Sequence, residues 1–445
     1  MKLNEQLKTR FEIDQVPSVA LEAVVKDNKY ECFYGAYNET GDKPTHSTLY
    51  GVASLTKSMT AVAIMKLQDK GKLLVTDLIK DWLPELKLPN QSGNKITIHH
   101  LLTHTAGFPG MHAFNLARLE SLKRDPDGLK IFGAFPKYKK QVVTVEDMIE
   151  AMNDSDYDLI AEPGTLFNYS NEAYALLEEI IKRASKESYI NYIKKIILDP
   201  LKMNHSVFTV DELDNYPEVA HSYAFTKNKD KKRYYSPTWW ESGEIYGSGA
   251  LKSTTSDILK YLEIFKGNHI LSKQALEAMT TAHIKTPNEN EYGYGLLVGE
   301  FEGKKVVGHG GGIKGVSSYM FVCKELDFTA VALTNIAEVS AEDYVLSTFN
   351  QITGIDISIS IKTADSLPDL TKYIGIYASN EGNEIIINQA NPHTLTMKFE
   401  HSSLELTYEK DDIFILPKGK KVAFVVQDEE VVGIFRGMRF LNKVS

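Results

Sequence analysis

Apolar residues change their spacing twice along this chain. Over about residues 18–51 they occur in short runs separated by polar turns, which predicts strands. From Ser54 onward, Met59, Val62 and Leu67 follow the i, i+3, i+4 type spacing of a helix that Gly71 is placed to end. Helical spacing dominates from about residue 76 to 239, and after one further helix strand-like runs return. The pattern therefore predicts strands, then helices, then strands again.

This order predicts an α/β domain, of the α+β kind, over residues 1–355. Its sheet lobe takes about residues 1–75 and 240–355, and an all-helical lobe takes about residues 76–239. Residues 366–445 carry near-alternating segments such as EIIINQ and VAFVVQ, typical of a separate small all-β domain, a sandwich or a barrel. Clefts form where two lobes meet, so the first domain is the expected place for a site.

Composition narrows the choice of partners. The chain has 445 residues, 43% of them hydrophobic, with 59 acidic and 50 basic side chains and a net charge of −9. This is a globular composition without a basic footprint, so we expect no nucleic-acid partner. The longest apolar run, Phe328 to Ala337, is shorter than the ~18 residues of a membrane span, and we expect none.

The N-terminal residues and the two cysteines show no signal peptide, zinc motif or disulfide pattern. The first residues, MKLNEQLKTRFEIDQV, carry charges and no apolar signal stretch, which predicts a cytoplasmic protein, or a secreted one already processed. Cys32 and Cys323 lie far apart and form no C-x-x-C, so we interpret them as small buried residues and expect no zinc site or disulfide framework.

The first candidate for chemistry is Ser54-Leu55-Thr56-Lys57 at the start of the first strongly apolar helix. Residues three apart lie on one helix face, so the Lys57 amine can reach the Ser54 hydroxyl. A serine becomes a nucleophile when a neighbouring base takes its proton, and a desolvated lysine can be that base. In isolation the same residues are more often a helix N-cap and a lysine that reaches solvent.

Two further motifs follow in order. Tyr169-Ser170-Asn171 precedes a predicted helix, and His309-Gly310-Gly311 follows the strand KKVVG. With S-x-x-K, they resemble the three signature motifs of the serine β-lactamase and penicillin-binding protein superfamily. The variant is similar to the class C branch, in which Tyr-x-Asn replaces Ser-Asp-Asn and His-x-Gly can replace Lys-Thr-Gly. The resemblance covers about residues 15–350 and implies a two-lobed fold with an antiparallel sheet flanked by helices.

The resemblance also implies roles for these residues. Ser54 would form an acyl-enzyme, while Lys57 and Tyr169 would share the role of base, the phenol through a pKa lowered by nearby cations. Asn171 would donate to the substrate amide or hold Lys57 in place. Taken singly, Tyr169 and Asn171 are more often a helix-flanking aromatic and an N-cap.

The third motif is expected on the substrate side of the cleft. By the resemblance, His309 replaces a lysine and contacts Tyr169 or a substrate carboxylate. The oxyanion hole is implied to be the backbone N–H groups of Ser54 and Gly312, and glycines at Gly311 and Gly312 let a substrate backbone approach closely.

These roles predict a serine hydrolase that needs no cofactor or metal and acts through an acyl-enzyme on a small-molecule or peptide amide or ester. A D-amino-acid-containing peptide is the leading substrate class, with weak or no β-lactamase activity because the third motif has a histidine. A small-ester carboxylesterase and a slow β-lactam- or peptide-binding module stay open as alternatives, as does a homo-oligomer. The segment PDLTKYIGIYAS resembles the start of a lipocalin-like domain, which shapes the cleft, mediates assembly or only adds stability.

Other signals have plainer interpretations. His100 and His104 have the i, i+4 spacing of zinc helices but lack the H-E-x-x-H glutamate, so we interpret them and His99 as structural. Gly310 to Gly315 fits G-x-G-x-x-G, yet a strand-like run follows it where a nucleotide site needs a helix. Trp239 and Trp240 either line the cleft or pack between the lobes.

Overall fold

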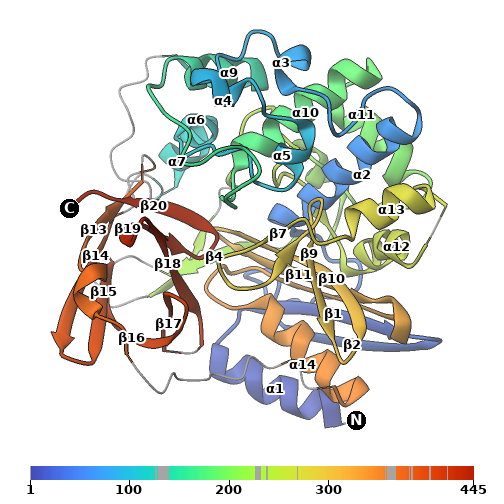
Figure 1. The fold of residues 1–445 in the computed structure, drawn as a ribbon. Helices are drawn as coiled ribbons and strands as arrows, with labels where there is room; N and C mark the ends of the chain where they lie inside the picture. Colours follow the sequence, from blue (N-terminus) through green and yellow to red (C-terminus); the bar gives the residue numbers. More distant parts are fainter. Residues whose placement is uncertain are drawn as a thin grey trace.

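The computed structural model describes most of the chain, in two parts that pack against each other (Figure 1). The described residues are 2–125, 128, 140–225, 232–236, 239–267, 269–355, 357, 367–379, 381, 384–399, 402–417 and 419–445. Most of the predicted junction between residues 355 and 366 therefore lies outside the described residues.

An antiparallel sheet forms the base of the first part, as expected. Its strands run in the order β2 (Asn28–Gly35), β1 (Ser18–Val25), β12 (Phe328–Thr334), β11 (Val316–Cys323), β10 (Lys304–Ile313), β9 (Leu297–Phe301), β8 (Glu291–Tyr292) and β7 (Ile284–Lys285). The first two strands of the sequence thus lie beside the last two of this part, and the helical lobe is inserted between them in the sequence.

Alternation along the strands fills two cores. On β1, Val19, Leu21 and Ala23 face the helices α1 (Lys2–Asp14) and α14 (Ala341–Thr353). The intervening Ala20 belongs to the core on the opposite face, where α12 (Thr255–Lys266) and α13 (Lys273–Met279) lie. Figure 1 shows α1 and α14 together on one side of the sheet, far from the helical lobe. The sequence pattern did not lead us to expect α1.

The remaining helices build the upper lobe in Figure 1. They are α2 (Thr56–Asp69), α3 (Ile79–Trp82), α4 (Asn90–Gly93), α5 (Ile98–Leu102), α6 (Ala113–Leu116), α7 (Leu119–Arg124), α9 (Val145–Asn153), α10 (Asn171–Ser185) and α11 (Tyr189–Ile193), which continues as a π-helical turn (Lys194–Leu198). The lobe is not wholly helical, because β4 (Ser222–Phe225) and β5 (Arg233–Ser236) form a hairpin within its sequence range. Short, partly exposed runs of this kind carry too little periodicity to be recognised from sequence.

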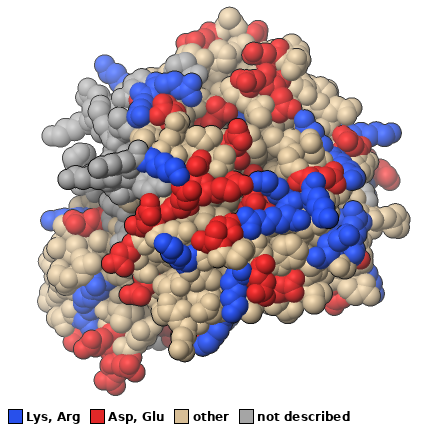
Figure 2. All heavy atoms as spheres, turned by 90° about the horizontal axis from the view of Figure 1, so that it is seen from above, with Lys and Arg blue, Asp and Glu red and all other residues tan. Residues whose placement is uncertain are grey.

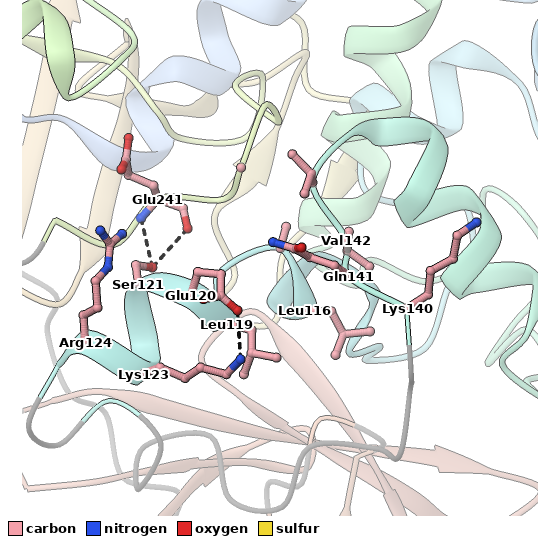
Figure 3. A pocket seen from close by; sticks show the side chains of 13 residues that line it. Leu116, Leu119, Glu120, Ser121, Lys123, Arg124, Lys140, Gln141, Val142 and Glu241 are labelled. Carbon is pink, nitrogen blue, oxygen red and sulfur yellow. Dashed lines mark hydrogen bonds and ion pairs between the residues drawn. The ribbon is translucent and has the colours of Figure 1, made fainter.

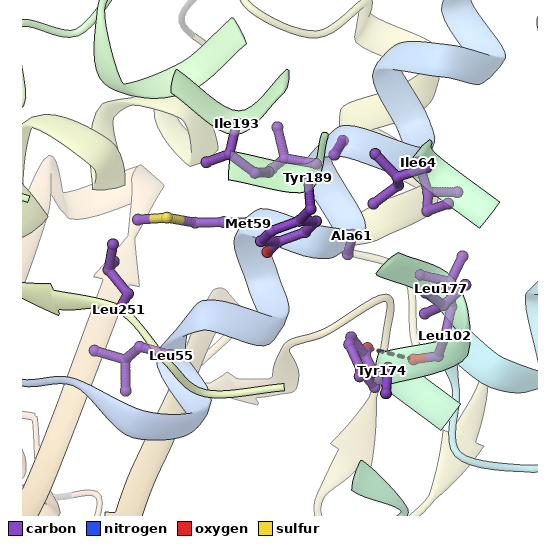
Figure 4. Close-up of a cluster of buried hydrophobic side chains, with 14 of the residues drawn as sticks. Leu55, Met59, Ala61, Ile64, Leu102, Tyr174, Leu177, Tyr189, Ile193 and Leu251 are labelled. Carbon is purple, nitrogen blue, oxygen red and sulfur yellow. Dashed lines mark hydrogen bonds between the residues drawn. The ribbon is translucent and has the colours of Figure 1, made fainter. Parts of the chain in front are cut away.

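Helix α2 is buried on nearly all sides, which makes it a rigid support. Its residues Met59 and Ile64 pack against Tyr174 and Leu177 of α10 and against Tyr189 (Figure 4). The helix ends at Asp69, and Gly71 follows in the left-handed conformation with φ +64°, as its position in the sequence predicted.

The second part is a closed antiparallel barrel. Its strands are β13 (Gly375–Ala378), β14 (Glu384–Asn391), β15 (Thr394–Phe399), β16 (Ser402–Lys410), β17 (Ile413–Ile415), β18 (Lys421–Gln427), β19 (Glu430–Arg436) and β20 (Arg439–Lys443). The sequence predicted a sandwich or a barrel, and the structure is a barrel. Closure removes exposed sheet edges, and alternate residues such as Ile385, Ile387 and Leu395 fill the interior.

Charged side chains of both signs cover one face of the molecule. On the face shown in Figure 2, acidic and basic side chains are interspersed over the described residues. Among the described residues, no helix is long and apolar enough to cross a membrane.

Candidate active site

Ser54 lies in a tight turn between the sheet and α2. Strand β3 (Tyr50–Gly51) pairs with β6 (Lys252–Ser253), and the 3₁₀ turn Ala53–Leu55 leads directly into the helix. Ala53 has φ +45°, a left-handed conformation that costs an alanine about 1 kcal/mol or more. The Thr56 hydroxyl donates to the Ala53 carbonyl at 2.7 Å and stabilises the turn. Backbone strain thus lies one residue before the predicted nucleophile.

Lys57 is fully buried beneath Ser54 and has three polar neighbours. Its Nζ lies 3.3 Å from Ser54 Oγ, 2.9 Å from Asn171 Oδ1 and 2.6 Å from the Ser248 carbonyl oxygen. Asn171 is free to make this contact because Ser170 caps α10, its hydroxyl accepting from the Ala173 N–H. The alternative interpretation of Asn171 as an N-cap and of Lys57 as a solvent-facing lysine is therefore wrong.

The surroundings of Lys57 favour its neutral form. Burial, and then the charges of Arg439 and Arg118, lower the pKa of Lys57 well below its usual 10.5. Since the Oδ1 of Asn171 and the Ser248 carbonyl only accept hydrogen bonds, a neutral amine donates its two hydrogens to them. Its lone pair then points to the third neighbour, the Ser54 hydroxyl.

Tyr169 lies beside this pair, with Lys57 Nζ 4.8 Å from the centre of its ring. The His104 ring packs against Tyr169 at a centroid distance of 4.2 Å, and His104 Nδ1 accepts from the Ser170 N–H. Burial raises the pKa of Tyr169 above its usual 10, outweighing the hydrogen bond with Ser54 and the charge of Arg439. The charge of Arg439 acts in the expected direction, but burial outweighs it, so the expected net lowering of the pKa is wrong and Tyr169 is a neutral hydroxyl at pH 7.

His309 lies on β10 one residue beyond the last pairing with β9, and its side chain is buried. The Gly310 carbonyl, 2.6 Å away, accepts from Nδ1, which leaves Nε2 to accept from the Tyr292 hydroxyl at 3.0 Å. Burial and the charge of Lys57 lower the pKa of His309 to about 4. The ring is thus neutral and its hydrogen bond goes to Tyr292, while its centroid lies 6.3 Å from that of Tyr169, one of the two expected neighbours.

Gly311 and Gly312 complete this wall for different reasons. A Cβ on Gly311 would lie 2.4 Å from the Val52 carbonyl oxygen and 3.0 Å from the Ser54 nitrogen, so β10 passes directly beside the Ser54 backbone. A Cβ on Gly312 would meet nothing within 4 Å. Gly311 is therefore required for packing, and Gly312 leaves open space.

A cleft of about 690 Å³ brings the three motifs together. Among its lining residues are Ser54, Tyr169, Asn171, His309, Gly311 and Gly312. A second hollow, of about 540 Å³, lies between α7, the segment before α9 and Glu241 (Figure 3). None of the motif residues lines it, and we assign the candidate site to the first cleft.

Several residues of this site were not expected from the sequence. Ser248 contacts Lys57 through its backbone carbonyl, and Arg118 and Arg439 line the cleft from distant segments without any motif. His104 was interpreted as a local structural histidine, yet it packs on Tyr169. Its neighbours His99 and His100 are indeed structural, bonding Tyr294 and capping α5. No group of three or more potential metal ligands occurs among the described residues.

The tryptophans and the glycine run take their plainer roles. Trp240 donates to Asp125 at 3.0 Å and Trp239 packs beside Gly51, and neither lines the cleft. The run Gly310 to Gly315 forms the end of β10 and its turn into β11, so it is a hairpin and has no following helix.

Comparison with known proteins decides the family. The family model described as Beta-lactamase matches residues 4–350, more than three quarters of the chain. The chain belongs to the beta-lactamase family. "Penicillin-binding protein 4*" of Bacillus subtilis (strain 168) is 26% identical over 420 residues, which cover 88% of this chain and 87% of that protein. The protein described here is thus a serine hydrolase of the penicillin-binding protein type. Its place in the class C branch stays a prediction.

Solved structures extend the similarity to the whole chain, barrel included. The octameric penicillin-binding protein homologue from Pyrococcus abyssi is 27% identical, with a TM-score of 0.71 and 99% of both chains covered. A D-stereospecific amidohydrolase from Streptomyces sp. shares the fold, with a TM-score of 0.64, 22% identity, and coverage of 80% of this chain and 99% of that chain.

Proposed function

We propose that the protein hydrolyses amides or esters through an acyl-enzyme on Ser54, and that its substrates are peptides containing a D-amino acid. The observation that carries the proposal is the buried Lys57 amine, with two acceptor-only neighbours and the Ser54 hydroxyl as the third. A lysine with a lowered pKa is able to act as a general base near neutral pH. The names of relatives, a penicillin-binding protein and a D-stereospecific amidohydrolase, support the substrate class.

In acylation, Ser54 Oγ attacks the substrate carbonyl carbon while Lys57 Nζ takes the hydroxyl proton. The carbonyl π electrons move to its oxygen, and the N–H groups of Ser54 and Gly312 would stabilise that oxyanion. The carbon–nitrogen or carbon–oxygen bond then breaks. Tyr169, neutral because burial raises its pKa, donates a proton to the leaving group and regains one from protonated Lys57.

Deacylation runs through the same groups in reverse. Water takes the place of the leaving group, and its oxygen bonds to the acyl carbon while Tyr169 takes its proton and passes its own hydroxyl proton to Lys57. The bond between the acyl carbon and Ser54 Oγ then breaks, and Ser54 Oγ regains a proton from Lys57. His309 is outside this relay, since its polar contacts go to Tyr292 and Gly310. Its part is to support the β10 wall beside Tyr169, with ring centroids 6.3 Å apart.

Covalent labelling tests the proposal directly. Intact-protein mass spectrometry after treatment with a fluorophosphonate, and separately with a penicillin, is expected to show one adduct that Ser54→Ala abolishes. Turnover of a D-alanyl peptide is expected to fall by about 10⁴-fold or more in the same variant. Ser47→Ala, at a serine outside the cleft, is the matched control. Labelling that persists in Ser54→Ala, or wild-type protein that takes neither reagent, would contradict the proposal.

A further inference from the structure

The cleft carries positive charge although the molecule as a whole is acidic. Three arginines, Arg118, Arg436 and Arg439, line it among the described residues, against one carboxylate, Glu342. The full chain has a net charge of −9. Charge of one sign gathered in a cleft attracts ligands of the opposite sign and strengthens their binding. The lining therefore points to an anionic group on the substrate.

Arg439 enters the cleft from the barrel. It follows the Gly437–Met438 turn between β19 and β20. Two hydrogen bonds join this turn and its next residues to the first part of the structure, which we call the catalytic part. The Tyr169 N–H donates to the Met438 carbonyl at 3.0 Å, and the Phe440 N–H donates to Asn168 Oδ1 at 2.9 Å. Arg439 is thus fixed next to Tyr169, the neighbour of the nucleophile.

One side of the Arg439 guanidinium is already used. Its Nη1 pairs with Glu381, a buried barrel residue, while 32% of the Arg439 side chain remains exposed. Because a guanidinium carries several N–H groups in a planar fork, one carboxylate partner leaves others for a ligand. Glu381 therefore orients Arg439 without occupying it.

Arg118 supplies the second cation from the catalytic part. Its Nε donates to the Ser242 hydroxyl at 3.0 Å, and the guanidinium lies 4.7 Å from the centre of the Phe114 ring. Both arginines line the same cleft, and burial and then the charge of Arg439 lower the pKa of Arg118 to about 10. The other nearby carboxyl group, Glu172, does not line the cleft and bonds to Phe114 and Ser170.

We propose that Arg118 and Arg439 together bind a free carboxylate of the substrate, close to the bond that is cleaved. The inference rests on the proposed acyl-enzyme function and adds the group that selects the substrate. Two guanidinium groups that line one cleft suit a carboxylate, which has two oxygens and offsets the charge that the arginines place there. His309 does not offer this charge, because its ring is neutral and bonded to Tyr292. The barrel thereby supplies half of the carboxylate site.

The test compares two peptides that differ only in charge, N-acetyl-D-Ala-D-Ala with a free carboxylate and the same peptide as its C-terminal amide. Binding is measured by calorimetry on the Ser54→Ala protein, so the result does not depend on catalysis. We expect the acid to bind about tenfold or more tighter than the amide. Adding Arg439→Gln or Arg118→Gln should weaken binding of the acid peptide by about that factor and leave binding of the amide peptide unchanged. Arg439→Lys should keep part of the preference for the acid peptide.

Lys398→Gln removes a charge from an exposed barrel position on β15 and is the matched control. Equal affinity for the two peptides, no binding of either, or equal weakening of both by the arginine variants would overturn the carboxylate site. Failure of the proposed function is distinguished by a different result, the absence of an adduct on Ser54 when wild-type protein is treated with the labelling reagents. Thermal unfolding of each variant separates loss of a contact from loss of the fold.

Discussion

The catalytic part and the barrel bury different kinds of residue. The catalytic part buries Lys57 and His309 in its interior, with pKa values lowered chiefly by burial. The barrel interior is filled by apolar residues such as Ile387 and Ile434 at 0% exposure, and its buried carboxylates Glu381 and Glu409 are paired with Arg439 and Lys421. Buried titratable groups cost stability and are typical of sites where protons move. In the proposed mechanism the proton transfers therefore belong to the first part, and the barrel has a supporting role.

The barrel nevertheless reaches the chemistry through one turn. Met438 accepts a hydrogen bond from the backbone of Tyr169, and Arg439 lowers the pKa of Lys57. A small domain thus alters the electrostatics of a neighbouring site without contributing a nucleophile or base. Among the described barrel residues, only Arg436 to Arg439 line the cleft, so we expect changes there to alter selectivity while the catalytic part keeps its reaction.

The largest effect should come from replacing the buried base. Lys57→Met removes the proton acceptor, and we expect kcat to fall by about 10²–10⁴-fold. The free energy of unfolding should fall by no more than about 1–3 kcal/mol, since the loss of hydrogen bonds to Asn171 and Ser248 is offset by the removal of a buried amine. Steady-state kinetics and chemical unfolding measure the two quantities.

Lys66→Met, on the same helix but bonded to the Ile270 carbonyl outside the cleft, is the control for Lys57→Met. A Lys57→Met enzyme with kcat within tenfold of wild type would show that the buried amine is structural, and the contrast between the two parts would lose its basis.

A smaller effect should follow from loosening the barrel turn. Asn168 joins the two parts, donating to the Phe108 carbonyl and accepting from the Phe440 N–H. Asn168→Ala leaves both groups unpaired and should cost about 1–3 kcal/mol of unfolding free energy. Because Arg439 precedes Phe440, kcat/KM for the free-acid peptide should fall by up to about tenfold relative to the amide. An equal fall for both peptides would mean that the turn supports the fold alone.

The smallest effect concerns pH. Lys57 acts when deprotonated, so kcat/KM for the uncharged amide peptide should rise with pH and level off well below pH 10.5, because the pKa of Lys57 is lowered. The positive charge of Arg439 disfavours a second charge on Lys57. Arg439→Gln should therefore raise the pKa of Lys57 and move the rising limb to higher pH, by less than about one unit.

A pH–rate profile of wild type, Arg439→Gln and the exposed control Lys398→Gln measures this shift. A limb that stays in place in Arg439→Gln, or moves to lower pH, would show that the barrel charge does not reach Lys57.

The motifs were recognisable from sequence because each is a short segment on one element. Ser54 and Lys57 lie a turn apart at the start of α2, and Tyr169 and Asn171 flank the start of α10, so local spacing alone brings each pair together. Arg118, Ser248 and Arg439 come from three other segments, and nothing in their local sequence marks them. Their positions in the cleft depend on how the lobes and the barrel pack against each other, and short segments of the sequence carry no signal for that packing.

By itself, the sequence determined the order of strands and helices, the barrel-like alternation after residue 366 and the identity of the reactive side chains, since these follow from local periodicity and residue chemistry. Only the tertiary structure decided their ionisation. Burial lowers the pKa of Lys57 and raises that of Tyr169, so the surroundings favour a neutral amine beside a neutral phenol. Desolvation and long-range charge depend on what surrounds a group in space, and residues such as Arg439 enter that surrounding only once the chain has folded.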